Sequence, residues 1–230
     1  MYLPRHFTLS DLAQIHAFVD TAGSADLVTF DGTRPVATLL PVIWDRPADG
    51  EDDGTADGDG APRSFGRLLG HLALANDQWQ TARPDAQALA IVRGPQAYIS
   101  PSWYESTARH GRTVPTWNYE AVHLTGPLTV HRDPEWLRAF VTRLTLRYED
   151  FRPRPWAVAD APPEYIDGQL RGIVGVEMSI VSVEAKQKLG QNRSTEDQIG
   201  AIKGLRAEPG PGPAAIADLM TANLPAADPD

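Results

Sequence analysis

Cationic and carboxamide side chains gather at the exit of the most strand-like stretch of the chain. Residues 172–185 are rich in isoleucine and valine, and the chain continues Lys186-Gln187-Lys188-Leu189-Gly190-Gln191-Asn192-Arg193. Ammonium, guanidinium and amide groups at a strand exit can bind a phosphate group or the polar edge of a heterocycle. The alternative is a solvated surface that leads into the next helix, for which Ser194 is the candidate N-cap.

A second polar group follows a predicted strand over residues 65–72. His71 stands at the end of that strand, and Asn76-Asp77-Gln78-Trp79 forms a polar helical turn shortly after it. A histidine at a strand end can line a ligand site, and it can equally be a partly buried imidazole whose hydrogen bonds are satisfied. The residue types alone leave both interpretations open.

Two aromatic clusters add large planar side chains. They are Tyr98-Ile99-Ser100-Pro101-Ser102-Trp103-Tyr104 and Val114-Pro115-Thr116-Trp117-Asn118-Tyr119. Tyrosine and tryptophan combine an apolar body with a polar tip, which suits a planar ligand or a subunit interface. For most of these rings we favour the simpler interpretation, which is packing within the protein.

Several classes of chemistry are excluded by what the sequence lacks. The 230 residues include no cysteine, so disulfides, thiolate metal sites, iron–sulfur clusters and cysteine nucleophiles are ruled out. A P-loop, a dinucleotide-binding glycine motif, a nucleophile elbow and the H-E-x-x-H zinc pattern are also missing. The six histidines show no metal-ligand spacing, so we predict no metal site, and no side chain stands out as a catalytic acid or base. Neither a membrane span nor a signal peptide is evident, which predicts a cytoplasmic protein.

The net charge of −9 belongs mainly to two segments. Residues 46–64 carry six acids, two arginines and no apolar side chain larger than alanine, which predicts a disordered acidic insertion. Residues 207–230 carry four acids and no base, which predicts a flexible acidic tail, although 214–224 can form a short helix. Each segment contributes −4, so the other 187 residues sum to −1. We therefore predict one folded domain over 1–206, with a charge that argues against a broad DNA-binding surface.

The elements that must position these groups are mostly strands. Hydrophobic alternation and turn residues predict strands at 26–30, 36–44, 65–72, 88–92, two segments within 116–131 and 172–185. Helices are predicted from Ser10 to the residue before Gly23, from Asp133 to Tyr148, and over 162–171. Many short strands with few helices predict a mainly β fold, a small β-barrel with α decorations.

Five motifs that occur in order along the chain resemble one protein family. They are Met1-Tyr2-Leu3-Pro4-Arg5-His6-Phe7, His71-x-x-x-x-Asn76-x-Gln78-Trp79, the two aromatic clusters, and Lys188-Leu189-x-Gln191-Asn192-Arg193. Together they resemble the PaiB-type family of FMN-binding negative transcriptional regulators over residues 1–206. The resemblance implies a split β-barrel similar to that of pyridoxamine 5'-phosphate oxidases. It also implies a homodimer that holds FMN in clefts at the subunit interface.

The resemblance also implies which residues meet the cofactor. They are Thr38, Leu39, His71, Asn76, Gln78, Trp79, Lys188, Gln191, Asn192 and Arg193. The strand over 36–44 would run beside the flavin, and the turn after His71 would lie near its ribityl phosphate. The terminal motif with Lys188 and Arg193 would reach the flavin from the partner subunit.

Three positions depart from the family pattern. Leu39 stands where the family has histidine, Gln187 where it favours tryptophan, and Gly190 where it favours serine. The alternative cofactors are therefore F420 and haem, and for haem the candidate ligands are His71, His110 and His123.

Three functions follow from this resemblance. The first is a flavin-dependent oxidoreductase or a flavin-linked regulator that binds a small molecule. The second is a transcriptional repressor that acts directly or through a partner. The third is a haem-binding or haem-degrading protein. The net charge disfavours direct DNA binding, because cations supply most of the affinity for phosphates.

Overall fold

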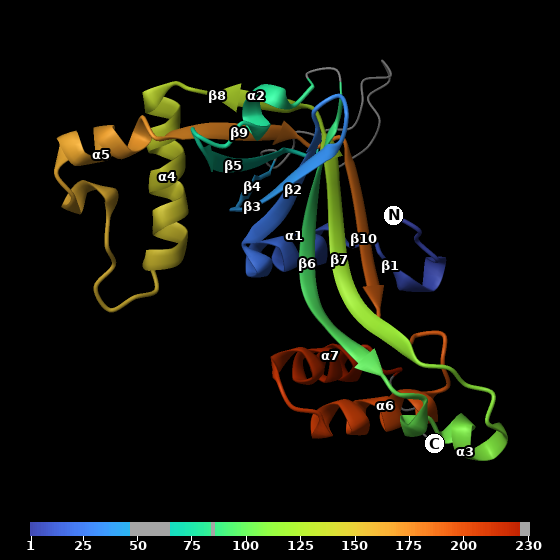
Figure 1. Ribbon diagram of the computed structural model, residues 1–230. Coiled ribbons are helices and arrows are strands. Elements are labelled where there is room, and N and C mark those ends of the chain that lie inside the picture. The colour runs from blue at the N-terminus through green and yellow to red at the C-terminus, as the bar shows by residue number, and fades with distance from the viewer. Residues whose placement is uncertain (47–64, 84–85, 226–230) are drawn as a thin grey trace, which may run out of the picture. The chain divides into compact units, whose positions relative to one another are not determined.

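The chain forms two compact units that interleave along the sequence. The computed structural model describes residues 1–46, 65–83 and 86–225 (Figure 1). Unit 1 contains Met1–Ile15, Arg93–Val122 and Glu184–Asp230, and unit 2 contains His16–Val92 and His123–Val183. Apart from Arg46, the predicted acidic insertion over 46–64 lies outside the described residues.

The described residues form ten strands and seven α-helices, and the sheets are antiparallel. The strands are β1 (Thr8–Leu9), β2 (Ser24–Phe30), β3 (Pro35–Pro41), β4 (Ile43–Asp45), β5 (Arg67–Ala73), β6 (Ala88–Ile99), β7 (Thr116–Gly126), β8 (Leu128–His131), β9 (Ile173–Ser179) and β10 (Ser182–Lys188). The helices are α1 (Leu12–Ala22), α2 (Gln78–Thr81), α3 (Glu105–His110), α4 (Pro134–Glu149), α5 (Pro163–Leu170), α6 (Thr195–Ala207) and α7 (Pro211–Ala222), with short 3-10 turns η1 (Arg5–Phe7), η2 (Pro101–Trp103) and η3 (Val158–Asp160). The predicted mainly β class is confirmed. None of the described helices is long and apolar enough to cross a membrane.

A tight hairpin joins β2 to β3 in unit 2, as the sequence predicts. The Asp31 carboxylate accepts hydrogen bonds from the Thr33 hydroxyl and from the backbone N–H groups of Thr33 and Arg34. These bonds, led by the Thr33 hydroxyl, lower the pKa of Asp31 to about 2. The register then pairs β2 with β3 from Ser24 opposite Pro41 to Phe30 opposite Pro35.

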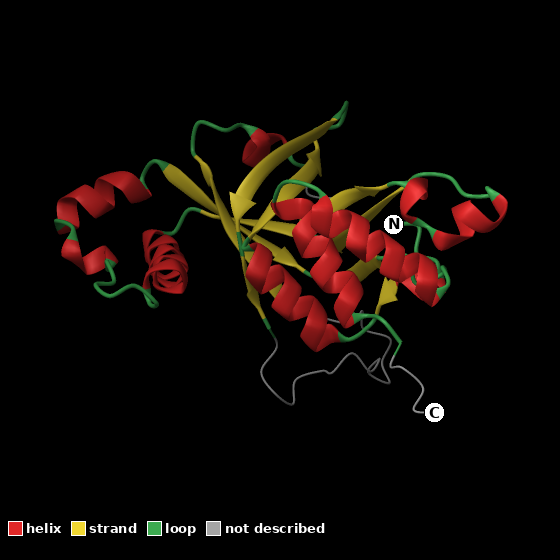
Figure 2. Ribbon diagram, turned by 90° about the horizontal axis from the view of Figure 1, so that it is seen from below, coloured by secondary structure: helices red, strands yellow, loops and turns green. Residues whose placement is uncertain are grey.

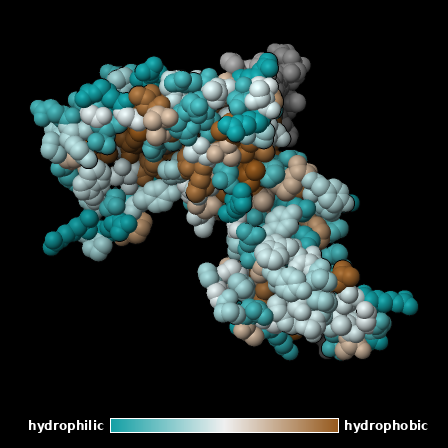
Figure 3. Space-filling view, in the orientation of Figure 1, coloured by the Kyte–Doolittle hydropathy of each residue, from teal (hydrophilic) through white to brown (hydrophobic). Residues whose placement is uncertain are grey.

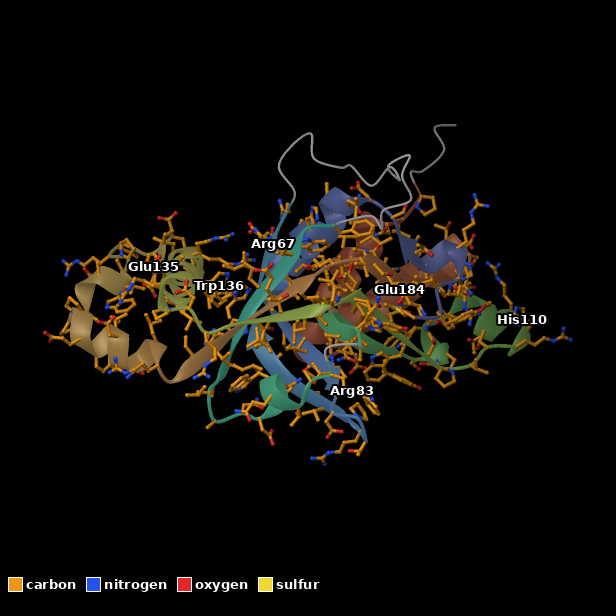
Figure 4. The ribbon with its side chains drawn as sticks, turned by 90° about the horizontal axis from the view of Figure 1, so that it is seen from above. Arg67, Arg83, His110, Glu135, Trp136 and Glu184 are labelled. Carbon is orange, nitrogen blue, oxygen red and sulfur yellow. The ribbon has the colours of Figure 1, made fainter. Side chains whose placement is uncertain are left out.

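The predicted helix that begins after Asp133 covers a four-stranded sheet with the order β4-β5-β9-β8. The Asp133 carboxylate accepts a hydrogen bond from the Trp136 backbone N–H at 3.0 Å, and Pro134 occupies the first helical position. Trp136 points toward the sheet and Glu135 away from it (Figure 4). The indole fills the space over Gly175, where an added Cβ would lie 2.2 Å from the ring. Figure 2 shows α5 and η3 beside α4 at this end of the sheet.

The interior of the barrel in unit 2 is filled by apolar side chains. It is lined by Ala25, Leu27, Leu40, Val42, Leu68, Leu69, Gly70, Ala90, Leu128, Val176 and Met178. The cavity that they leave has a volume of about 10 Å³. Even a single water needs a polar cavity of at least this size, so a ligand as large as a flavin must bind outside the barrel.

The strand predicted over 172–185 is two strands in different sheets. β9 pairs with β5 and β8, whereas β10 pairs with β1. At the join, the backbone N–H of Ile180 donates to Gly66 and that of Val181 donates to Thr125. The prediction of one strand is wrong because these long-range bonds redirect the chain at 180–181, and the apolar pattern does not change there. β6 is also longer than the strand predicted over 88–92, because it continues through Gly94 and Pro95 to Ile99.

The chain end packs into the core of unit 1, where the sequence predicts a flexible tail over 207–230. Helix α7 lies beside α6 (Figure 1), and Ile216, Ala217 and Met220 are at most 2% exposed. Their core cluster also contains Ala97, Ile99, Tyr104, Leu189, Ala201, Ile202 and Leu205. The prediction is wrong for 211–222 because the apolar residues recur at helical spacing and outweigh the proline-rich, acidic composition. The last residues, 226–230, lie outside the described part of the chain.

Candidate functional site

Three of the residues that the resemblance assigns to the cofactor form one hydrogen-bond network in unit 2. The Thr38 hydroxyl donates to Gln78 Oε1 at 2.6 Å, and Asn76 Nδ2 donates to the Thr38 hydroxyl at 3.0 Å. Asn76 Oδ1 also accepts from the Gln78 backbone N–H at 3.0 Å. The network therefore joins the turn before α2 to strand β3.

The Gln78 side chain is fully buried and fully engaged. Its Nε2 group lies 3.0 Å from the carbonyl oxygen of Leu27, 3.1 Å from the hydroxyl of Thr29 and 3.2 Å from the carbonyl oxygen of Val36. Its exposed fraction is 0%. With both amide ends occupied, Gln78 holds the β2–β3 hairpin against α2 and presents no free group to a ligand in this conformation.

His71 lies apart from this network within unit 2. It stands on β5 opposite Gly175 of β9, and its ring packs edge-on against Phe140 with a centroid distance of 5.8 Å. Burial lowers the pKa of His71, so the imidazole is neutral at physiological pH. Its Nδ1 atom is buried and has no hydrogen-bond partner among the described residues. The sequence places His71 at the end of its strand, whereas the structure places it inside β5, two residues before Ala73. The unpartnered nitrogen is therefore enclosed, and only a small buried group such as a water could bond to it.

Trp79 and Leu39 complete the predicted group in unit 2. The Trp79 indole N–H donates to the carbonyl oxygen of Leu74 at 3.1 Å, and the Arg132 guanidinium lies over the indole at 5.6 Å. Leu39 instead points to solvent from β3, with 67% of its surface exposed.

Leu39 belongs to an exposed apolar surface, which we call the apolar sheet face. Its apolar members are Pro35, Ala37 and Leu39 on β3, Val28 and Phe30 on β2, and Leu89 and Ile91 on β6; Asp26 of β2 lies on the same face between Leu39 and Ile91. They point away from the barrel interior, because the alternate residues Leu27, Leu40 and Ala90 are the buried ones. Apolar side chains gather over β2 and β3 in the space-filling view (Figure 3). An exposed surface that is mainly apolar marks an interaction site.

The terminal motif forms a cation cluster in unit 1, defined by Lys186, Lys188 and Arg193. Burial lowers the pKa of Lys188, and the charges of Lys186 and Arg193 lower it further. Lys188 Nζ donates to the hydroxyl of Thr116 and to the carbonyl oxygen of Trp117, and the Arg193 guanidinium lies 4.8 Å from the centre of the Tyr104 ring. Lys186 Nζ donates to the carbonyl oxygen of Tyr2, and the Asp197 carboxylate interacts with the charge of Arg193. Three cations against one carboxylate leave a net positive potential, which favours an anion.

The amides of the terminal motif shape the loop after β10. Gln191 Oε1 accepts from the Leu189 backbone N–H at 2.8 Å, and Gln191 Nε2 donates to the carbonyl oxygen of Gln187 at 2.7 Å. Asn192 is exposed in the turn that follows. The ten predicted residues therefore form two groups, of which 38–79 lie in unit 2 and 188–193 in unit 1.

Glu120 is a polar residue of unit 1 that the sequence does not single out. It is 9% exposed on β7, and its Oε1 accepts a hydrogen bond from Gln187 at 2.6 Å. Gln187 occupies the position where the family favours tryptophan. The glutamine at this position therefore supplies the hydrogen-bond donor to the Glu120 carboxylate. Only the alternation of β7 after Trp117 places Glu120 on the buried face, and that register is not evident from the sequence.

Replacing Glu120 with glutamine is expected to stabilise the protein at neutral pH and to have no effect in acid. Burial raises the pKa of Glu120 above its ordinary value of 4.5, and the bond from Gln187 offsets only part of this. Ionisation therefore costs folding free energy above the folded-state pKa, whereas below about pH 4 the group is protonated in both states and the cost vanishes. Thermal melts at neutral pH and near pH 4 test this, with Glu208→Gln, at an exposed position, as the control. Equal melting temperatures of wild type and Glu120→Gln at neutral pH would contradict the expectation.

The histidines proposed for haem lie on separate elements. His110 ends α3 (Figure 4), and its Nδ1 accepts from the backbone N–H of Arg112 at 3.0 Å. His123 lies on β7 and His71 on β5. Among the described residues, no three His, Asp or Glu side chains converge as the ligands of a metal ion would.

The architecture is that of split β-barrel proteins. The flavocytochrome Anf3 from Azotobacter vinelandii has a TM-score of 0.52 and 13% identity, over 81% of this chain and 72% of that chain. The FAD and haem binding protein from Mycobacterium smegmatis has a TM-score of 0.53 and 14% identity, over 84% of this chain and 79% of that chain. At such identities the likeness shows the fold alone, and the predicted split barrel is confirmed.

Sequence comparison then identifies the family. The family model described as "Putative FMN-binding domain" matches residues 1–182. "Protease synthase and sporulation protein PAI 2" of Bacillus subtilis is 32% identical over 224 residues, which cover 97% of this chain and 98% of that protein. The chain belongs to this PaiB-type family, as its five ordered motifs predict.

Proposed function

We propose that the protein binds FMN and acts as a flavin-dependent oxidoreductase or a flavin-linked regulator. The observation that carries this proposal is the cation cluster at the exit of β10, where Lys188 is half-buried with Lys186 and Arg193 close enough to act on its charge. The phosphate of FMN is a dianion with three acceptor oxygens, and lysine and arginine bind such groups well. The family match to an FMN-binding domain supports the same cofactor.

Exposed aromatic side chains beside the cluster suit the flavin ring. Tyr98 and Trp117 are 49% and 47% exposed, and their rings lie 6.4 Å apart. Trp117 also holds Lys188 through its carbonyl oxygen. An aromatic surface next to cations matches a ligand that is planar at one end and anionic at the other. Bound FMN would supply the redox chemistry, and the protein would supply binding, orientation and exclusion of water.

Replacing Arg193 with alanine is expected to weaken FMN binding about 10- to 100-fold, because a charge-assisted hydrogen bond contributes about 1.5–3 kcal/mol. Titration of FMN followed by quenching of its fluorescence measures the effect. Arg5→Ala removes an exposed arginine of unit 1 outside the cluster and serves as the matched control. Equal affinities of Arg193→Ala and wild type would remove Arg193 from the cofactor site.

We also propose that the protein is a homodimer with the cofactor at the subunit interface. The apolar sheet face supports this assembly, because its rows Phe30–Pro35 and Ala37–Val28–Leu89 are apolar and can pack against a second copy around a two-fold axis. The row that contains Leu39 carries one carboxylate, Asp26. The second copy of the chain is the partner that the family resemblance implies.

Substituting Leu39 with aspartate is expected to convert the dimer to monomer. The substitution places a charge at Leu39, which is 67% exposed on the apolar sheet face, where a dimer would have to desolvate that charge. Light scattering after gel filtration measures the mass of each species. Gln169→Asp introduces the same charge at an exposed position of α5 and should leave the dimer intact. A dimeric Leu39→Asp variant would show that the apolar sheet face is not the interface.

A further inference from the structure

A separate pocket lies in unit 2 between the start of α4, the end of α5 and the first residue of β9. It encloses about 440 Å³ and is lined by Leu74, Arg132, Pro134, Leu137, Asp167, Leu170, Arg171 and Ile173. Leu137 and Leu170 are at most 5% exposed and form its floor, and Leu74 and Ile173 are half-buried beside them. The volume lies within the range of small-molecule sites, and the lining is mainly apolar, as in such sites.

The charges at the rim are predominantly positive. Arg132 and Arg171 both line the pocket, and within the described part of the chain neither makes an ion pair or a hydrogen bond through its guanidinium. The carboxylate in the lining, Asp167, is paired with Arg138 of α4. The Asp133 carboxylate caps the start of α4 by accepting from the Trp136 backbone N–H, so it interacts with the helix N-terminus. An acidic ligand would therefore meet two guanidinium groups that no carboxylate neutralises.

Arg132 is held in place before any ligand arrives. Its guanidinium lies 5.6 Å from the centre of the Trp79 ring, and the Trp79 N–H is fixed by the carbonyl oxygen of Leu74, which itself lines the pocket. A cation stacked on an aromatic face loses less freedom when it binds an anion. Arg171, at the end of α5, is exposed and free to complete the contact.

We propose that this pocket binds a small organic carboxylate with an aromatic or alkyl body. Planar guanidinium groups match carboxylate oxygens in a two-bond geometry, and the apolar floor accepts the hydrocarbon part. Inorganic phosphate would leave the floor unfilled, and a neutral hydrocarbon would leave the arginines without an acceptor. This pocket is distinct from the cation cluster proposed for the phosphate of FMN, so the protein would receive a second small-molecule signal or substrate here.

Calorimetric titration with cinnamate tests this site in the full-length protein. One cinnamate should bind per chain, and cinnamyl alcohol, the neutral analogue, should bind at least about tenfold more weakly, as should inorganic phosphate. Arg132→Gln and Arg171→Gln should each weaken cinnamate binding about tenfold or more, and both residues are exposed, so the melting temperature should not change. Arg154→Gln, at an exposed arginine that does not line the pocket, should bind like wild type.

Any of four results would overturn the assignment. These are no binding of cinnamate, equal affinity for cinnamate and cinnamyl alcohol, unchanged affinity in both pocket variants, and loss of cinnamate binding when the protein is saturated with FMN. The last result would assign the two arginines to the phosphate of the flavin. Failure of the chain to bind FMN leaves the cinnamate titration unaffected, so the two proposals are tested separately.

Discussion

Truncating the chain after Glu208 is expected to abolish the cooperative folding of unit 1. Helix α7 contributes Ile216, Ala217 and Met220 to the core, and each is at most 2% exposed. Burying one large aliphatic side chain contributes about 1.5–3 kcal/mol, so two of them with the half-buried Leu219 approach the total stability of an ordinary domain. The truncated chain should show a broad or absent thermal transition, together with rapid proteolysis within 93–122 and 184–208.

A pair of point variants keeps this test independent of the truncation itself. Ile216→Ala should lower the free energy of unfolding by about 2–5 kcal/mol, because it leaves a cavity in the core. Ala214→Ser, at an exposed position of the same helix, should stay within about 0.5 kcal/mol of wild type. If Ile216→Ala has wild-type stability, α7 does not belong to the core, and the sequence-based prediction of a flexible tail would be correct.

Replacing Gln78 with methionine should destabilise the protein by about 3 kcal/mol or more. Methionine is similar in shape to glutamine but cannot form these hydrogen bonds. The substitution therefore removes the bonds that Gln78 makes with the hydroxyl of Thr38 and with the carbonyl oxygens of Leu27 and Val36. Each buried polar group left unsatisfied costs about 1–3 kcal/mol. Chemical denaturation measures the loss, and Gln80→Met, at an exposed position of α2, is the control.

The same variant separates two roles for Gln78. If it serves only as a cofactor ligand, Gln78→Met keeps the stability of wild type and loses affinity for FMN. If it holds the β2–β3 hairpin, as its four side-chain hydrogen bonds indicate, stability falls whether or not FMN is present. Unchanged stability would contradict the structural role.

The elements that could be predicted from the sequence have local causes. Asp133 and Ser194 begin helices through hydrogen bonds to backbone N–H groups two or three residues away, and Asp31 closes its hairpin in the same way. The features that could not be predicted have distant partners. The chain turns from β9 into β10 because Ile180 and Val181 bond to residues far along the sequence, and no local signal marks that point.

The candidate site follows the same division. The motif that ends at Arg193 is contiguous in the sequence, so its cations can be predicted to lie near one another. The structure shows Lys186 and Arg193 close enough to Lys188 to act on its charge. Glu120 accepts a hydrogen bond from Gln187, which lies 67 positions away in the sequence. Arg132 and Arg171 line the same pocket, although they flank different helices. Only the paired register of strands and the packing of helices bring such residues together, and neither can be deduced from residue types.

The visible absorbance spectrum of the purified protein tests the central claim most directly. Protein that is incubated with FMN and then freed of unbound cofactor by gel filtration should retain the absorbance bands of oxidised flavin, with one FMN per chain. A spectrum with protein absorbance alone would contradict FMN binding. A Soret band in place of the flavin bands would also contradict it, and would assign the protein to haem.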